Sequence, residues 1–140
     1  MRGLFRSLEL RFDSNPTLRL LGRKLYEGFE DQRVNVARPY VEVNPNLPDR
    51  ADTFDSDLEI WNLPFRYHAK DLRTTAATEW IEAMENVFRD ANIFSQYFST
   101  CGVRMMEASV PSLSNGLYEA TVRFQLTLQR RANLPLVRRT

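Results

Sequence analysis

The sequence predicts an α+β domain: a mainly antiparallel sheet with one long helix, about residues 74–91, packed on it and short N-terminal helices before it. Three observations predict this class. Apolar residues recur at helical spacing over 74–91, and residues 118–131 alternate between apolar and polar side chains. An Asn-Gly pair at 115–116 marks a hairpin turn just before that alternation. We expect a single domain over residues 1–131, followed by a basic C-terminal arm, residues 132–140.

Helices are expected near the N-terminus and again over residues 74–91. A helix over residues 4–12 is indicated by Leu4, Phe5, Leu8 and Phe12. The run 13–15 ends it, and Pro16 suits the first turn of a second short helix that ends at Gly22. The long helix 74–91 has one apolar stripe, made of Ala76, Ala77, Trp80, Ile81, Met84, Val87, Phe88 and Ala91.

Strands are expected in between. A short one falls around Leu25 and Tyr26, residues 39–43 are extended, and 44–52 form a loop that contains two prolines. A long β segment covers 55–68, and its apolar residues change from even to odd positions. Because a strand changes face only at a bulge or a turn, we predict one within residues 61–64, around Pro64.

The C-terminal part reads as a hairpin. Residues 102–111 form a strand with a change of face between Met105 and Met106, and the turn at 112–116 leads into the alternating strand. The apolar face of that strand is Tyr118, Ala120, Val122, Phe124, Leu126 and Leu128. Its other face is polar, so it serves as a solvated surface or as a seam with neighbours.

Composition limits the class of protein. With 140 residues, 43% of them hydrophobic, the chain can bury a genuine core, and its one cysteine, Cys101, excludes an internal disulfide. No apolar run is long enough to cross a bilayer and the N-terminus is charged, so we expect no membrane partner and assembly in a cytoplasm. Residues 1–129 carry 15 bases and 18 acids, whereas the last eleven residues carry four arginines and no acid.

Residues that could carry chemistry are few. His68 is the only histidine, and no nucleophile elbow, Walker loop or GxGxxG motif is present, so we predict no enzyme, no catalytic residues and no cofactor. We interpret His68 as a strand-end residue with ordinary hydrogen bonds and Cys101 as a small apolar residue. The acidic stripe of Asp55, Asp57 and Glu59 could gather a cation, but we favour a solvated face or a subunit contact over a metal site.

The arginine-rich end has three interpretations. It is a solubilising terminus, a contact to nucleic acid, or an assembly arm in which the apolar run 132–137 lies between two arginine pairs. We favour the arm. The predicted interface residues are therefore the acidic stripe together with Arg123, Arg130, Arg131, Arg138 and Arg139.

The order of these features resembles the bacteriophage tail terminator proteins, also called tail completion or minor capsid proteins of the neck. The resemblance rests on the helix "LFRSLELRF", the run "DSNPTLRLLGRKLYEG", the strand "RPYVEV", the helix "AATEWIEAMENVF" and the closing strand "GLYEATVRFQLTLQR". It covers about residues 4–131. The loop 44–57 and the arginine tail 130–140 depart from the pattern of the family.

The resemblance implies a structural virion protein located in the tail or neck. Such a protein forms a homo-oligomeric ring, most often a hexamer, that caps the tail tube and joins it to the head-tail connector or stopper protein. DNA passes through the lumen without being read. A cyclic ring needs two different complementary patches per subunit, and the acidic stripe and the arginine tail are one such pair.

Two other classes of function stay open. Within virion assembly, the chain could be a head-tail stopper, an adaptor or a tube subunit. Outside it, the arginine tail could make the chain a DNA-binding module, or His68 with the acidic stripe could form an active site, which we rank last.

Overall fold

A computed structural model describes residues 4–29, 37–44, 49–50, 58–69, 74–89, 98–109, 112–114 and 117–130. Three helices in these ranges are α1 (Leu4–Asp13), α2 (Pro16–Gly22) and α3 (Thr74–Phe88). The strands are β1 (Leu25–Glu27), β2 (Tyr40–Val43), β3 (Asp49–Arg50), β4 (Leu58–His68), β5 (Phe98–Ala108), β6 (Ser112–Ser114) and β7 (Leu117–Arg130). The predicted α+β class is therefore confirmed.

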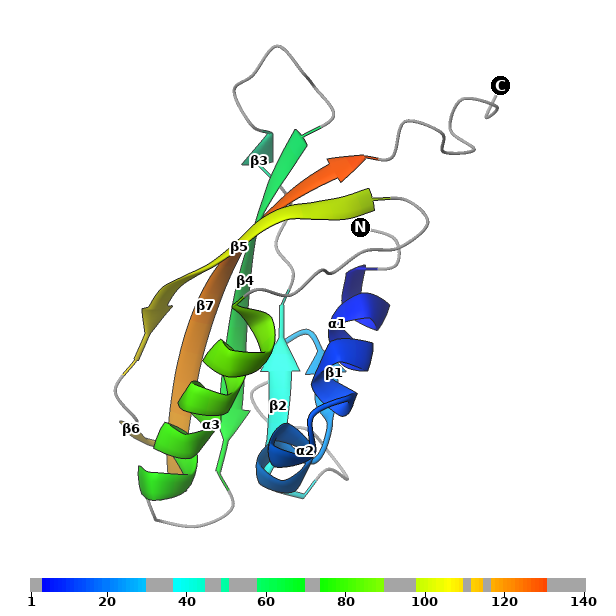
Figure 1. The fold of residues 1–140 in the computed structure, drawn as a ribbon. Coiled ribbons are helices and arrows are strands. Elements are labelled where there is room, and N and C mark those ends of the chain that lie inside the picture. The colour runs from blue at the N-terminus through cyan, green and yellow to red at the C-terminus, as the bar shows by residue number, and fades with distance from the viewer. Residues whose placement is uncertain are drawn as a thin grey trace.

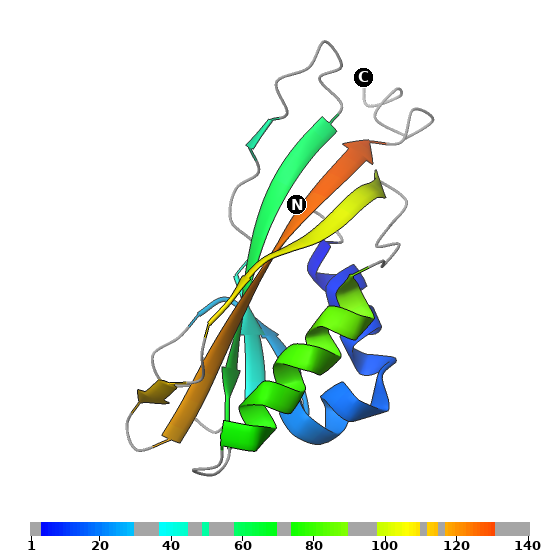
Figure 2. The ribbon, with the colours of Figure 1, turned by 60° about the vertical axis from the view of Figure 1, so that its left-hand side comes forward.

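The sheet is organised around its two long central strands. Strands β4 and β7 pair antiparallel without interruption from Leu58 opposite Gln129 to His68 opposite Glu119. The strand order is β1-β2-β4-β7-β5, with β3 beside β4 and β6 beside β7. Only β1 and β2 pair in parallel among the described strands. Figures 1 and 2 show the long strands crossing the molecule with a strong twist.

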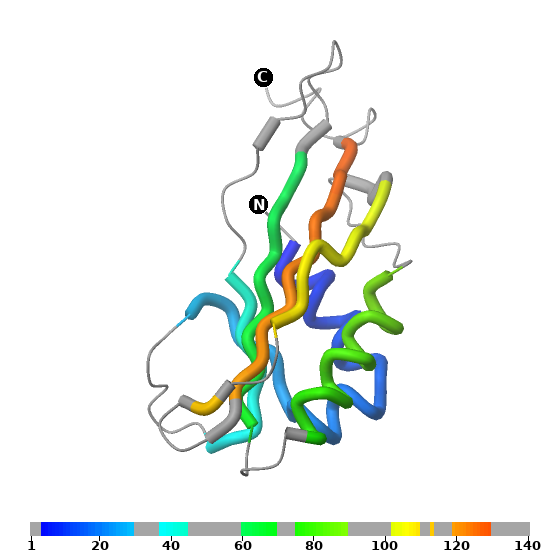
Figure 3. Tube along the Cα trace, turned by 90° about the vertical axis from the view of Figure 1, so that its left-hand side faces the viewer, coloured from blue at the N-terminus to red at the C-terminus, as the bar shows by residue number. Residues whose placement is uncertain are grey.

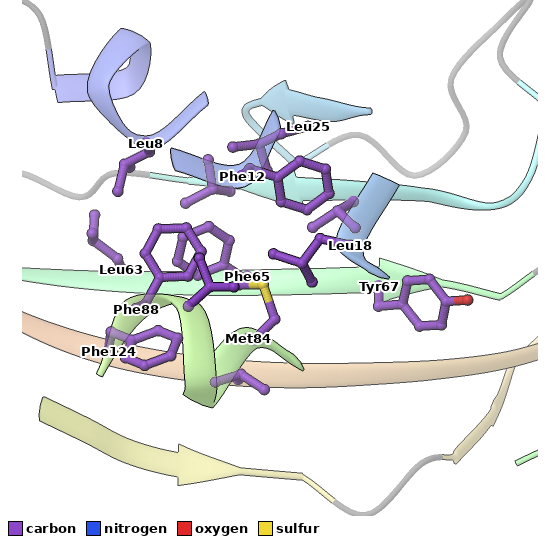
Figure 4. Close-up of a cluster of buried hydrophobic side chains, with 14 of the residues drawn as sticks. Leu8, Phe12, Leu18, Leu25, Leu63, Phe65, Tyr67, Met84, Phe88 and Phe124 are labelled. Carbon is purple, nitrogen blue, oxygen red and sulfur yellow. The ribbon is translucent and has the colours of Figure 1, made fainter. Parts of the chain in front are cut away.

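All three described helices cover one face of this sheet, so the domain has two layers (Figures 1 and 3). Strand β7 buries the apolar residues that its alternation predicted to face inward, from Ala120 to Leu128. This is the pattern of a half-buried strand. The core between the layers joins residues of every helix and of four strands (Figure 4). Its largest fully buried members are Trp80, Tyr67, Phe12, Phe65, Phe88 and Phe124.

Helix α3 carries the predicted stripe, with small differences. Ala77, Trp80, Met84, Val87 and Phe88 are buried, whereas Ala76 and Ile81 are only half-buried. Ala83, which was not assigned to the stripe, is also buried. Residue 91, the predicted end of the helix, lies outside the described residues.

The corner between α1 and α2 is built as the sequence suggests. Asn15 caps α2 by accepting a hydrogen bond from the Leu18 amide on its side-chain oxygen, at 3.0 Å, and Pro16 follows at the first turn. At the other end, a Cβ on Gly22 would lie 2.7 Å from Cγ2 of Val41. Only glycine lets α2 approach β2 this closely.

The predicted change of face in β4 is wrong. Its register with β7 is unbroken, and Trp61, Leu63, Phe65 and Tyr67 all point into the core. Pro64 lies at the margin of the pairing with β2, whose last residue, Val43, is opposite Phe65. Its carbonyl still accepts from the Asn44 amide, at 3.2 Å, so the missing N–H of proline costs at most one bond at the end of this ladder.

The bulge predicted in the strand before the hairpin is confirmed. The register of β5 against β7 shifts between Met105 and Glu107, and again between Thr100 and Gly102. Strand β6 pairs with β7 as the predicted hairpin requires, although the turn residues 115–116 lie outside the described residues. The predicted loop 44–52 contains the two-residue strand β3, which pairs with Glu59 and Ile60.

Candidate functional site: the outer face of the sheet

The face of the sheet opposite the helices is polar; we call it the outer face. Strands β4 and β7 contribute to it in register, with Asn62 opposite Gln125, Pro64 opposite Arg123 and Arg66 opposite Thr121. These side chains are half-buried. Helices on this face are absent from the part of the chain that the structure describes, so the strands themselves present it (Figures 1 and 2).

One end of the outer face holds a buried charged cluster centred on His68. Its ring Nε2 lies 2.7 Å from Oε1 of Glu42, and its Nδ1 lies 3.1 Å from Oε1 of Glu119. Glu42 is fully buried and His68 is 2% exposed. The imidazole therefore bridges two carboxyl groups that come from different strands.

Two arginines complete the charge balance of this cluster. Nη2 of Arg38 lies 3.5 Å from Oε1 of Glu119, and its Nη1 donates to the Ala69 carbonyl at 3.4 Å. Nη1 of Arg66 lies 4.0 Å from Oε1 of Glu42, and its guanidinium lies 4.1 Å from the centre of the Phe29 ring. These contacts place one arginine near each acid, Arg38 near the partly exposed Glu119 and Arg66 near the fully buried Glu42.

The cluster joins three strands rather than forming an open reaction site. Glu42 lies on β2, His68 ends β4 and Glu119 lies on β7, while the Tyr40 ring stacks on the imidazole with centres 4.4 Å apart. Both ring nitrogens of His68 are occupied and its ring is almost inaccessible. His68 is a strand-end residue as interpreted, and its partners are two carboxyl groups, the fully buried Glu42 and the partly exposed Glu119.

The structure describes three of the eight predicted interface residues, Glu59, Arg123 and Arg130. Asp55, Asp57, Arg131, Arg138 and Arg139 lie outside the described residues. Glu59 pairs in register with Leu128, whereas Arg123 pairs with Pro64, so their positions belong to opposite faces of the sheet. Arg130 ends β7 opposite Phe98.

Arg123 is the predicted interface residue whose side chain is described. Its Nη2 lies 3.2 Å from Oε2 of Glu107 on β5, and both side chains are substantially exposed. Its buried Nε has no described acceptor. Exposed pairs of this kind contribute little to stability.

The two carboxyl groups that contact His68 were not predicted from the sequence. A signal existed for Glu42, because a single acid inside the apolar run Tyr40–Val43 must find a partner if the strand is buried. No comparable signal existed for Glu119, which occupies the polar face of an alternating strand. Its role depends on the register that places it opposite His68.

The described residues contain no group of three His, Cys, Asp or Glu side chains placed to hold a metal ion. The acids of the His68 cluster bind opposite ring nitrogens, so they do not converge on one point. None of the described helices is both long and apolar enough to span a membrane.

Comparison with known proteins gives a likeness of fold. No protein-family model matches the chain, and no curated protein sequence matches it. Among solved structures, the fold is similar to a chain of the "Virion of native gene transfer agent (GTA) particle", with a TM-score of 0.66 and 13% identity. The likeness covers 92% of this chain and 99% of that chain. It establishes a shared fold over nearly the whole length of both chains.

Proposed function

We propose that this protein is a structural component of a phage-like particle and that it acts as a tail terminator. In this role a homo-oligomeric ring, of six copies, sits at the head-tail junction, caps the tail tube and joins it to the head connector or stopper. DNA passes through the lumen. The observation that carries the proposal is the fold shared, nearly end to end, with a chain of a gene transfer agent virion.

The order of elements supports the same role. The run that resembles the tail terminators corresponds to α2 and β1, and the "PYV" motif begins β2. The alternating strand β7 is central in the sheet, with its polar side on the outer face. A rigid, polar strand surface of low net charge suits the lining of a channel or a seam between subunits, because DNA must slide past without being held.

Loss of the protein gives the direct test. In cells that produce such particles, deletion of its gene is expected to leave filled heads separate from tails, and the free tails are expected to have irregular lengths, because nothing stops tube polymerisation. Electron microscopy of lysates measures both features, and a plasmid-borne copy should restore joined particles.

The same experiment separates the sibling roles. Loss of a stopper or adaptor leaves unattached tails of normal length, and loss of a tube subunit leaves no tails. Joined particles with tails of normal length would contradict all of these roles. In that case the DNA-binding interpretation becomes the favoured one. It is tested by deleting residues 131–140 and measuring the salt dependence of DNA affinity.

A further inference from the structure

The helical layer carries a basic patch with an apolar centre around α2. An open groove of about 550 Å³ is lined by Asp13, Ser14, Pro16, Arg19, Leu20 and Arg23. Leu20 is 80% exposed, the most exposed of the large hydrophobic residues described. Arg19 and Arg23 are exposed and make no ion pair with a described residue. An exposed leucine between two unpaired arginines is typical of a contact surface.

The backbone holds this patch rigidly. Arg23 has a φ of 63° and a ψ of −61°, and the Lys24 amide donates to the Gly22 carbonyl at 2.6 Å. This is a γ-turn, a strained conformation for a residue other than glycine. The Arg23 amide also donates to the Arg19 carbonyl at 2.9 Å. The two arginines are therefore joined through a fixed turn instead of a flexible loop.

A patch of opposite charge lies on the other side of α2. Glu79 and Glu82 are exposed on α3 and line a groove of about 250 Å³ with Asn15, Thr17, Ala83 and Asn86. Glu85 lies one turn further along and is half-buried. None of these three acids forms an ion pair with a described residue. Unpaired like charges three residues apart on a helix repel one another, so a cationic partner would stabilise them.

We propose that the α2 patch of one copy (Arg19, Leu20 and Arg23) docks on the α3 patch of the next copy (Glu79 and Glu82). The two patches differ and are complementary, which defines a head-to-tail contact, and a head-to-tail contact that closes produces a ring. The occupant is a second copy of this chain because each patch supplies the charge that the other lacks. This inference rests on the proposed function, since it names the contact that builds the ring.

Charge reversal tests the contact. Two double variants are made: one carries Arg19→Glu and Arg23→Glu, and the other carries Glu79→Arg and Glu82→Arg. Each should raise the concentration at which the oligomer forms, on the order of 100-fold, because like charges then face each other. All four changes in one chain restore opposite charges and should bring assembly back to within about 10-fold of the wild type. Sedimentation velocity at several concentrations measures the change, and circular dichroism checks that each variant is folded.

A matched pair of leucine variants tests the apolar centre. Leu20→Ser should weaken assembly about 10-fold or more, because it removes the apolar anchor of the contact. Leu113→Ser changes another exposed leucine, 61% exposed on β6 and outside both patches, and should leave assembly unchanged.

The outcomes distinguish this contact from the proposed function. Rings that form equally well in both charge-reversal variants would overturn the contact and leave the tail terminator role intact. Reversal variants that assemble poorly but are not rescued by the fourfold change would also overturn it. Joined, normal tails after gene deletion would instead overturn the role, whatever the variants do.

Discussion

Replacement of His68 by alanine is expected to lower the free energy of unfolding by about 3–5 kcal/mol. The change leaves Glu42, which is fully buried, without the ring nitrogen that lies 2.7 Å from its Oε1. It also removes the stacking of Tyr40 on the imidazole. Since small domains are stable by only about 5–15 kcal/mol, this is a large fraction of the total. Urea unfolding, followed by far-UV circular dichroism, measures the loss.

Two controls make the result specific to the charged cluster. Arg123→Ala breaks the exposed pair with Glu107 and should change stability by no more than about 1 kcal/mol. Adding Glu42→Leu to His68→Ala removes the buried carboxylate that has lost its histidine partner, so the double variant should be more stable than His68→Ala alone. A double variant that is less stable by the sum of the two single losses would show that burial of the acid is not the cause.

Replacement of Trp80 by alanine should have a comparable effect, about 3–5 kcal/mol, through the loss of packing. Trp80 is fully buried on α3, and its ring stacks on Tyr67 with centres 5.1 Å apart. Tyr67 in turn donates from its hydroxyl to the Leu21 carbonyl at 3.0 Å, so the same contact links α3, β4 and α2. Denaturant unfolding of the purified variant measures the loss.

The matched control is Trp80→Phe. The indole Nε1 is buried and has no acceptor among the described residues, so phenylalanine keeps much of the apolar contact and removes an unpaired donor. Its cost should be well below that of alanine. Equal losses for phenylalanine and alanine would contradict the importance of ring packing at this position.

Sequence patterns predicted burial well where the period of a single helix or strand determines which of its residues face the core. The alternation in β7 and the stripe on α3 each predicted which side chains are buried, because strand and helix periods fix the face of every residue. The bulge after Met105 was found for the same reason. In β4 this reasoning failed, since the change of the apolar residues from even to odd positions predicted a change of face, whereas Trp61, Leu63, Phe65 and Tyr67 lie in one unbroken register and all face the core.

The His68 cluster could not be predicted, because it depends on register between strands that are distant in sequence. Glu42, His68 and Glu119 meet only when β2, β4 and β7 are aligned as observed. The same holds for the acidic stripe, where Glu59 proves to occupy the opposite face from Arg123. The patches on α2 and α3 were also missed, since exposed charges on separate helices have no signature until the helices are packed.

The native mass of the purified protein tests most directly the claim that this protein assembles into a ring. Sedimentation velocity over a wide range of concentrations measures the mass, and negative-stain imaging then shows the shape of the largest species. The proposal predicts a six-fold ring with a central hole, formed in solution or on added tail tubes. A chain that remains monomeric at every concentration, and also when mixed with tail tubes, would contradict it.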